Sequence, residues 1–169
     1  MKIPRFEIKA KIEKMNMLLD TFHEKGLPVF FIQHNGIKEN YLLPGTEDFD
    51  LEESLHVLTN DIRIEKKVNS AFYETILKEQ LDSLKINTLY AAGLATEFCV
   101  NATVLDALNY DYTVIVAGDG HTTADKDLLS AQQIIKFYNW LWPNLTPTKG
   151  KIEIQDTSEI IKKLEDKGC

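Results

Sequence analysis

The sequence predicts an α/β protein in which helices cover both faces of a doubly wound, mostly parallel sheet. Two continuous apolar runs of strand length, residues 28–33 and 113–117, are typical of strands that are buried on both sides. Other strand-like runs alternate with helical patterns along the chain, as in a parallel sheet wound by crossover helices. A chain of 169 residues suffices for one core, so we expect a single domain over residues 1–169.

The first predicted element is an amphipathic helix, in which apolar residues recur at steps of four and three from Ile8 until Gly26 ends it. The strand at residues 28–33 then places His34 at its carboxyl end. Residues 35–60 are rich in Gly, Glu, Asp and Asn and predict a long loop. The remaining predicted elements are, in order, a strand at residues 62–65, a helix at 75–84, a strand at 88–93, a helix at 97–109, a strand at 113–117, a helix at 127–142, a strand at 151–154 and a helix around 160–164.

Composition and charge argue against several classes of partner. The formal net charge is -7 and the lysines are scattered among glutamates, so we expect no nucleic-acid partner. No apolar run approaches the roughly 20 residues that cross a bilayer, and residues 1–5 lack the apolar core of a signal peptide, so we expect no membrane partner and a cytoplasmic location. The two cysteines, Cys99 and Cys169, form neither a disulfide framework nor a zinc spacing, so we expect neither metal nor cofactor.

Residues 92–99 form the turn that carries the predicted chemistry. Ligand sites of open α/β sheets lie beyond the carboxyl ends of the strands, where strands turn into helices. Gly93 leaves the strand here, Thr96 is expected to cap the following helix, and Cys99 falls in its first turn. The free N–H groups and the dipole of that turn favour a thiolate. The alternative is that Cys99 is simply a small buried apolar residue.

Two segments carry a resemblance to a known family. Residues 93–100, Gly-Leu-Ala-Thr-Glu-Phe-Cys-Val, resemble the Gly-x-Ala-Thr-x-x-Cys-Val signature of isochorismatase-like cysteine hydrolases, which include nicotinamidases and carbamoylsarcosine amidases. Residues 65–72 are similar to the family's segment in which a catalytic lysine precedes a Ser/Gly-Ala-Phe triplet, and the register of the triplet selects Lys66. A lysine at a strand end is ordinarily a solvated charge, which is what we expect of Lys67.

The resemblance implies a set of roles for individual residues. Cys99 would be the nucleophile and Lys66 its partner. The peptide bond between Leu94 and Ala95 would be cis, and the N–H groups of Ala95 and Cys99 would form an oxyanion hole. Phe72 is a candidate wall of the substrate pocket, although a lone Phe is equally at home in the core. Thr96 is a second candidate for the pocket. Residues 113–123 resemble the family's next strand and the Asp-containing loop after it.

The resemblance also implies a residue that this sequence lacks. Family members begin with an apolar central strand that ends in an Asp, the general base of an Asp-Lys-Cys triad. Residues 6–8 are too short and too charged for that strand, and Asp20 falls within a helical pattern, where an i,i+4 or solvent role is expected. We therefore expect weak or absent activity for the polypeptide as written, and a gap in the sheet that something fills or around which the sheet rearranges.

Three explanations of this departure stand open: a truncated gene model, which we prefer, a silent protein in which another segment or subunit fills the position of the missing strand, and a general base recruited from elsewhere.

The predicted function is hydrolysis of a small amide or related small-molecule substrate by Cys99 with Lys66. The alternative is a catalytically silent protein of the same fold with a binding or assembly role. His34 has no carboxylate partner nearby in the sequence, which disfavours the metal site of nicotinamidases and favours a hydrogen-bonded loop residue.

The resemblance further implies a homo-oligomer, either a dimer or a tetramer. Aromatic residues of the helix predicted at 127–142 belong either to the core or to an oligomer face. These residues are Phe137, Trp140 and Trp142.

Overall fold

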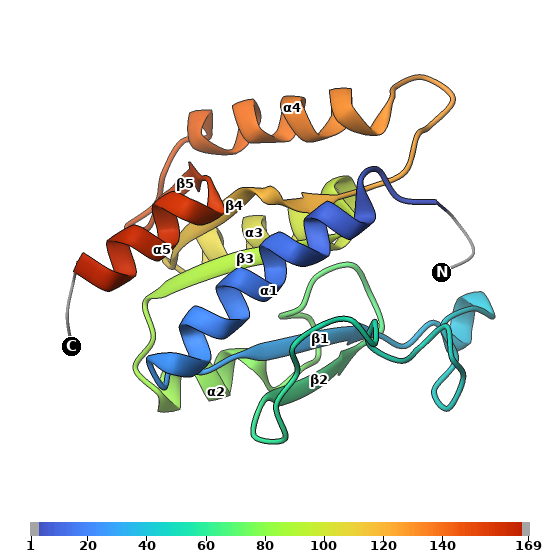
Figure 1. Cartoon of the computed structure of the whole chain (residues 1–169), viewed down its shortest axis with the longest axis horizontal. Helices are drawn as coiled ribbons and strands as arrows, with labels where there is room; N and C mark the ends of the chain where they lie inside the picture. Colours follow the sequence, from blue (N-terminus) through green and yellow to red (C-terminus); the bar gives the residue numbers. More distant parts are fainter. Residues whose placement is uncertain (1–3, 167–169) are drawn as a thin grey trace.

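The described strands of the protein lie in two parallel sheets, and no backbone ladder between described residues joins them. The computed structural model describes residues 4–166, and within them β1 pairs with β2, while β4 lies between β3 and β5. The elements follow one another as α1 (Ile8–Glu24), β1 (Phe30–His34), η1 (Ile37–Glu39), β2 (Ile62–Lys66), α2 (Leu77–Ser83), β3 (Thr88–Leu94), η2 (Thr96–Val100), α3 (Asn101–Asn109), β4 (Thr113–Thr122), α4 (Ala131–Leu141), η3 (Trp142–Asn144), β5 (Ile152–Gln155) and α5 (Thr157–Asp166) (Figure 1).

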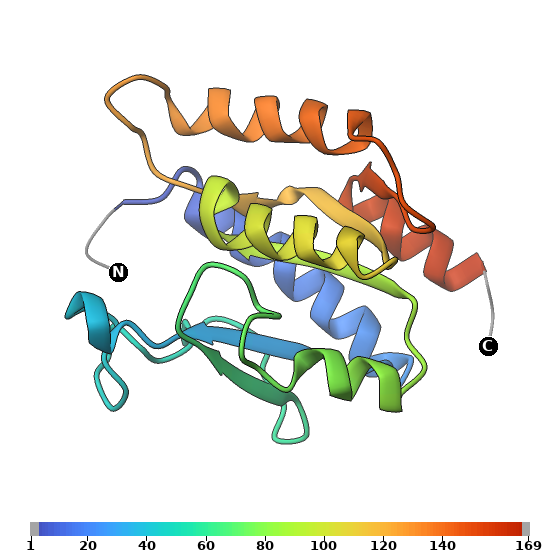
Figure 2. The ribbon, with the colours of Figure 1, turned by 180° about the vertical axis from the view of Figure 1, so that it is seen from behind.

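Helices cover both faces of the three-stranded sheet, which confirms the doubly wound α/β prediction. On one face, Leu18 of α1 and Ile160 of α5 pack against Ala117 of β4, and both helices lie in front of the sheet in Figure 1. The opposite face carries α3, which lies in front in Figure 2. Val104 of α3 packs there in one cluster with Val116 of β4.

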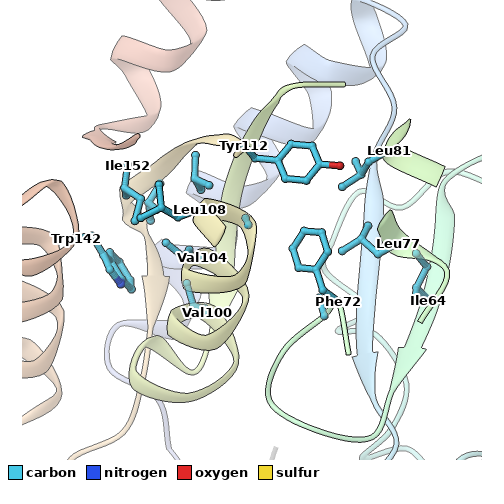
Figure 3. Close-up of a cluster of buried hydrophobic side chains, with 14 residues drawn as sticks. Ile64, Phe72, Leu77, Leu81, Val100, Val104, Leu108, Tyr112, Trp142 and Ile152 are labelled. Carbon is cyan, nitrogen blue, oxygen red and sulfur yellow. The ribbon is translucent and has the colours of Figure 1, made fainter. Parts of the chain in front are cut away.

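One core connects the two sheets although their backbones are not paired. Ile64 of β2 and Leu81 of α2 belong to the same buried cluster as Val104 of α3 and Trp142 of η3. Figure 3 shows this cluster, with Phe72 lying between the side chains of α2 and those of α3. Burial of apolar side chains thus holds the two sheets together, although no backbone hydrogen bonds of a ladder join them.

A position between β1 and β3 lacks a strand. β1 is the strand of its sheet that lies toward β3 in both Figures 1 and 2, yet within residues 4–166 no ladder joins them. β4 has partners on both sides and is almost entirely buried, whereas every residue of β1 is only half-buried. The expected gap is therefore present, no described strand fills it, and the sheet is divided in two.

Most predicted elements are confirmed, and two boundaries need correction. β4 continues to Thr122 through residues 118–120, where the sequence predicts a loop. It does so because β3 extends alongside it and because the Asp119 carboxylate accepts the Thr157 N–H at 2.8 Å. α4 begins at Ala131 and not near residue 127, because Ser130 and Gln133 form a capping box there. In the described part of the chain no helix combines the length and the apolarity that a membrane span requires.

Candidate active site

The turn between β3 and α3 carries the cysteine that the sequence singled out. The peptide bond between Leu94 and Ala95 is cis, as the resemblance implies. The chain then enters η2, a π-helical turn, in which the Ala95 carbonyl oxygen accepts the N–H groups of Phe98 and Val100 at 3.1 and 3.2 Å. The Cys99 N–H lies between these two donors in the chain and is not bonded to that oxygen. π-Helical turns are rare and occur frequently at functional sites.

Thr96 does not cap the helix, so that prediction is wrong. Ala95 holds the cap position, and Thr96 is the fully buried first residue of η2. The Thr96 hydroxyl lies 2.8 Å from Nδ1 of His121, and Nε2 of the same ring lies 2.8 Å from Oδ1 of Asn139. The Asn139 amide nitrogen donates to the Gly118 carbonyl oxygen, so its Oδ1 accepts, Nε2 of the ring carries the proton, and the Thr96 hydroxyl donates to Nδ1.

His121 is neutral in this arrangement. Burial lowers its pKa to about 4, and the hydrogen bond to Asn139 only partly opposes that change. A neutral ring with one donor and one acceptor matches its two partners without a buried charge. The Thr96–His121 pair thus anchors the start of the turn that presents Cys99.

The side chain of Cys99 is half-buried and faces the segment after β2. Its Sγ lies 3.9 Å from Oδ1 of Asn69. A cysteine that served only as an apolar core residue would be closed to solvent, so the alternative interpretation of Cys99 is not supported. Cys169, the other cysteine, lies outside the described residues.

Lys66 is the last residue of β2 and is buried, in contrast to its exposed neighbour Lys67. The Lys66 ammonium donates to the carbonyl oxygens of Val68 at 3.0 Å and Asn69 at 2.8 Å. Lys66 is therefore not a solvated charge, whereas Lys67 is exposed, as predicted. Within residues 4–166 no carboxylate forms an ion pair with Lys66. An ammonium buried in this way favours an anion beside it.

Asn69 joins the two candidate residues, and sequence reasoning missed it. Its backbone carbonyl oxygen binds Lys66, while its side chain meets Cys99. The ends of three strands supply this arrangement: β1 and β2 end in register at His34 and Lys66, and β3 leads into the cysteine turn. The only signal in the sequence was the position of Asn69 three residues after Lys66.

A comparison with known families assigns this chain to a family. The model of the isochorismatase domain matches residues 5–139, which is most of the chain. The chain belongs to the isochorismatase family. The matched span includes Lys66, Asn69 and the whole Cys99 turn.

Relatives and solved structures agree with this assignment. The chain is 33% identical over 116 residues to the isochorismatase family protein YrdC of Bacillus subtilis, a match that covers 68% of this chain and 62% of YrdC. It is 32% identical over 108 residues to the ureidoacrylate amidohydrolase RutB of Methylorubrum extorquens, covering 62% of this chain and 44% of RutB. The chain thus spans less than two thirds of these curated relatives.

Among solved structures, a hydrolase of the isochorismatase family from Chromobacterium violaceum has a TM-score of 0.86 and 26% sequence identity. The match covers 97% of this chain and 85% of that chain. The arrangement of helices and strands in this isochorismatase-family chain is therefore shared with a solved family member.

The two predicted pocket residues, Phe72 and Thr96, are both buried. Phe72 is buried in the core, with its ring 5.3 Å from that of Tyr110 and 6.0 Å from that of Tyr112 (Figure 3). Thr96 is fully buried against His121. Phe72 is thus a core residue, which was the alternative to a pocket wall. Thr96 supports the Cys99 turn from inside the protein.

The charged residues considered for the missing base also have definite positions. Asp20 lies on α1 and binds Nδ1 of His56 at 2.8 Å, with both side chains about half exposed, so its solvent role is confirmed. His34 ends β1, and neither of its buried ring nitrogens has a hydrogen-bond partner within residues 4–166. Nε2 of His34 lies 3.9 Å from a carboxylate oxygen of Glu39. The described residues contain no group of three His, Cys, Asp or Glu side chains that could hold a metal ion.

The aromatic residues of the C-terminal half divide between core and surface. Trp142 is fully buried, and its indole N–H donates to Oδ1 of Asn101 at 3.0 Å. Phe137 and Trp140 on α4 are about half exposed or more, with ring centroids 6.0 Å apart. Only these last two are available for an oligomer face.

Proposed function

We propose that this isochorismatase-family chain is a cysteine hydrolase of a small amide or related substrate, with Cys99 as nucleophile and Lys66 as its partner. The observation that carries the proposal is the meeting of both residues at Asn69, where a buried ammonium and a half-buried thiol share one neighbour. The name of the relative RutB, a ureidoacrylate amidohydrolase, supports amide chemistry. An ammonium near a thiol stabilises the thiolate, which is the nucleophilic form.

The proposed reaction proceeds through a covalent intermediate. The Cys99 thiolate attacks the amide carbonyl carbon and forms a carbon–sulfur bond, while the carbonyl oxygen becomes an oxyanion. The N–H groups of Ala95, which precedes η2, and of Cys99, which lies within it, would stabilise that oxyanion, a contribution typically of about 3 kcal/mol per donor. The carbon–nitrogen bond then breaks as the Lys66 ammonium protonates the leaving nitrogen.

Water completes the cycle. The neutral Lys66 amine takes a proton from a water molecule, whose oxygen attacks the thioester carbon. The carbon–sulfur bond breaks, the acid leaves, and the thiolate beside the Lys66 ammonium is restored. These reaction steps use only groups that the described residues supply, and they require no carboxylate base.

A catalytically silent role is the second candidate, and one observation favours it. Within residues 4–166 no carboxylate pairs with Lys66, and the strand position between β1 and β3 has no described occupant. A protein of this fold without a general base would bind small molecules or other copies without turnover.

Hydrolysis of a panel of primary amides, ureido acids and small esters tests the two candidates, with release of ammonia or amine as the readout for the amides and ureido acids and release of acid as the readout for the esters. The proposed enzyme hydrolyses at least one class, and Cys99→Ser abolishes that hydrolysis without changing the circular dichroism spectrum. Turnover that survives Cys99→Ser contradicts the proposed nucleophile. No turnover by a folded, alkylation-competent protein supports the silent role.

We also infer that copies of the chain associate through α4. The support is the exposed aromatic pair Phe137 and Trp140, since large apolar side chains grouped on a surface mark contact sites. Light scattering after gel filtration is expected to give a dimer or tetramer mass, which Trp140→Lys reduces. A monomer at micromolar concentration contradicts this inference.

A further inference from the structure

Two polar side chains of α3 bind the segment that follows β2, and the proposed reaction does not use them. The Ala71 N–H donates to the Thr103 hydroxyl oxygen at 3.0 Å, and the Ser70 hydroxyl donates to the Asp106 carboxylate. Both acceptors lie on α3, the helix that continues η2. Two hydrogen bonds thus fasten the segment after β2 to the helix that follows the Cys99 turn.

The hydroxyl of Ser70 needs the carboxylate of Asp106 as an acceptor. Oγ of Ser70 accepts the Phe72 N–H at 3.1 Å, and an ionised carboxylate can only accept, so the hydroxyl hydrogen is directed to Asp106. Ser70 and Ala71 are both buried. Loss of either acceptor on α3 would therefore leave a donor of a buried residue without its partner, which is costly.

The spacing along the helix places both acceptors in line with the nucleophile. Thr103 comes four residues after Cys99, Asp106 comes three residues after Thr103, and residues three and four apart lie on one face of a helix. On the other side of these contacts, Asn69 meets Cys99 and Ser70 meets Asp106. The segment after β2 therefore lies along the helix face that presents the sulfur.

These hydrogen bonds matter because the two sheets share no ladder. Within residues 4–166 no ladder joins β2, which ends at Lys66, to β3, which leads to Cys99. The apolar core between the sheets is non-directional, whereas hydrogen bonds require a defined geometry. The bonds to α3 therefore determine where Asn69 lies, and the Asn69 carbonyl oxygen in turn accepts the Lys66 ammonium at 2.8 Å.

We propose that Thr103 and Asp106 are positioning residues of the hydrolase, which hold the Lys66 ammonium beside Cys99. They act through the backbone of residues 69–71 and do not touch the reacting atoms. Their loss would let the ammonium move away from the thiol, and the thiolate would lose the charge that stabilises it. This inference rests on the proposed function, because it assigns the groups that orient its two reacting residues.

Alkylation of Cys99 by iodoacetamide at pH 7 tests the positioning role without requiring hydrolysis. Cys169→Ala leaves Cys99 as the single thiol. Asp106→Leu and Thr103→Val are each expected to slow the reaction about three- to tenfold, the usual coupling within one hydrogen-bond network. The direction for Asp106→Leu excludes a simple charge effect, because removal of a carboxylate near a thiol favours the thiolate and would speed the reaction.

Conservative variants separate positioning from a loss of charge or of stability. Asp106→Asn keeps an oxygen that accepts the Ser70 hydroxyl, and Thr103→Ser keeps the hydroxyl oxygen that accepts the Ala71 N–H. Both variants are expected to react within about twofold of the natural chain. Val104→Ala truncates a core side chain of the same helix (Figure 3) and is the matched control, since it destabilises the fold and should leave the rate within about twofold.

A double-mutant cycle with Lys66→Met shows whether the effect passes through the ammonium. In the Lys66→Met chain, Asp106→Leu should change the rate by no more than about twofold, because the ammonium that Asp106 positions is absent. Independent effects would slow both chains by the same factor. Ser70→Ala removes the hydroxyl that donates to Asp106, and it replaces Asp106→Leu in the cycle if that variant does not fold.

Three outcomes overturn the positioning role. They are a rate that neither Asp106→Leu nor Thr103→Val changes, an equal slowing by Val104→Ala, and the same slowing with and without the Lys66 ammonium. If Lys66→Met still slows the reaction, each of these outcomes contradicts only the positioning role. A rate that Lys66→Met does not change contradicts the pairing of Cys99 with Lys66, and the proposed function fails with it.

Discussion

The imidazole of His121 accepts the hydroxyl hydrogen of Thr96 across 2.8 Å, directly beneath the turn that begins at the cis peptide bond. Both side chains are fully buried. The acceptor role of Nδ1 requires a neutral ring, because a protonated imidazole has two donors and no acceptor. Protonation of His121 would therefore break the hydrogen bond that anchors the start of the Cys99 helix.

The free energy of unfolding is expected to fall with pH below 6.5. The His121 pKa is about 4 in the folded chain and 6.5 in the unfolded chain, so the unfolded chain binds more protons between these values. The stability that depends on a neutral His121 is complete above pH 6.5 and is lost as pH falls toward 4. We expect a loss of about 2 kcal/mol at pH 5 relative to pH 7.5 from this residue alone. Urea titrations at the two pH values measure it.

His121→Gln provides the control for this prediction, because glutamine does not titrate. Its loss of stability between pH 7.5 and pH 5 should be about 2 kcal/mol smaller than that of the natural chain. If the variant does not fold, the ring resonances of His121 should instead show no titration down to pH 5 in the natural protein. Titration near pH 6.5 would show that the ring is not held neutral.

Asn69→Asp is expected to slow the alkylation of Cys99 at pH 7 by about tenfold or more. The substitution places a carboxylate near 4 Å from Sγ, and a like charge at that distance disfavours the thiolate. Asn69→Ala is the control, because it removes the side chain and keeps the carbonyl oxygen that binds Lys66. Its rate should stay within about threefold of the natural chain. Equal rates for all three chains would place Asn69 away from the reactive sulfur.

The divided sheet should make the exchange rates of backbone amides alternate along β1 and along β3. In β1 the Asn35 N–H bonds to β2, so the amides of Phe31 and Gln33 point the same way and that of Ile32 points toward β3. In β3 the Tyr90 amide likewise points away from β4. We expect the amides of Ile32 and Tyr90 to exchange faster than their neighbours in solution NMR. Uniform protection along both strands would mean that the two edges are paired.

The sequence predicted the order of elements because each carried a local signal. The steps of four and three from Ile8 gave α1, and the apolar run before His34 gave β1. The extension of β4 past Ala117 was missed because residues 118–120, Gly-Asp-Gly, look like a turn. Their strand geometry comes from contacts with β3 and with Thr157, which are distant in sequence.

The site was predictable only in part, for a similar reason. The Cys99 turn and Lys66 were predicted from the resemblance. The structure distinguishes Lys66 from Lys67, because Lys66 is buried and Lys67 is exposed. Asn69 had no signal of its own, because its role arises where the segment after β2 meets the turn after β3. Thr96 was misassigned because a Thr before a helix ordinarily caps it, whereas here a buried histidine takes its hydroxyl.

The alkylation rate of Cys99 in chains that differ at Lys66 and Lys67 tests the central claim most directly. In the Cys169→Ala background, the folded chain is expected to react with iodoacetamide at pH 7 about tenfold faster than the same chain unfolded in urea. Lys66→Met should remove that advantage, and Lys67→Met, which deletes the exposed neighbouring charge, should keep it. A folded rate no higher than the unfolded rate, or equal effects of the two substitutions, would contradict the pairing of Cys99 with Lys66.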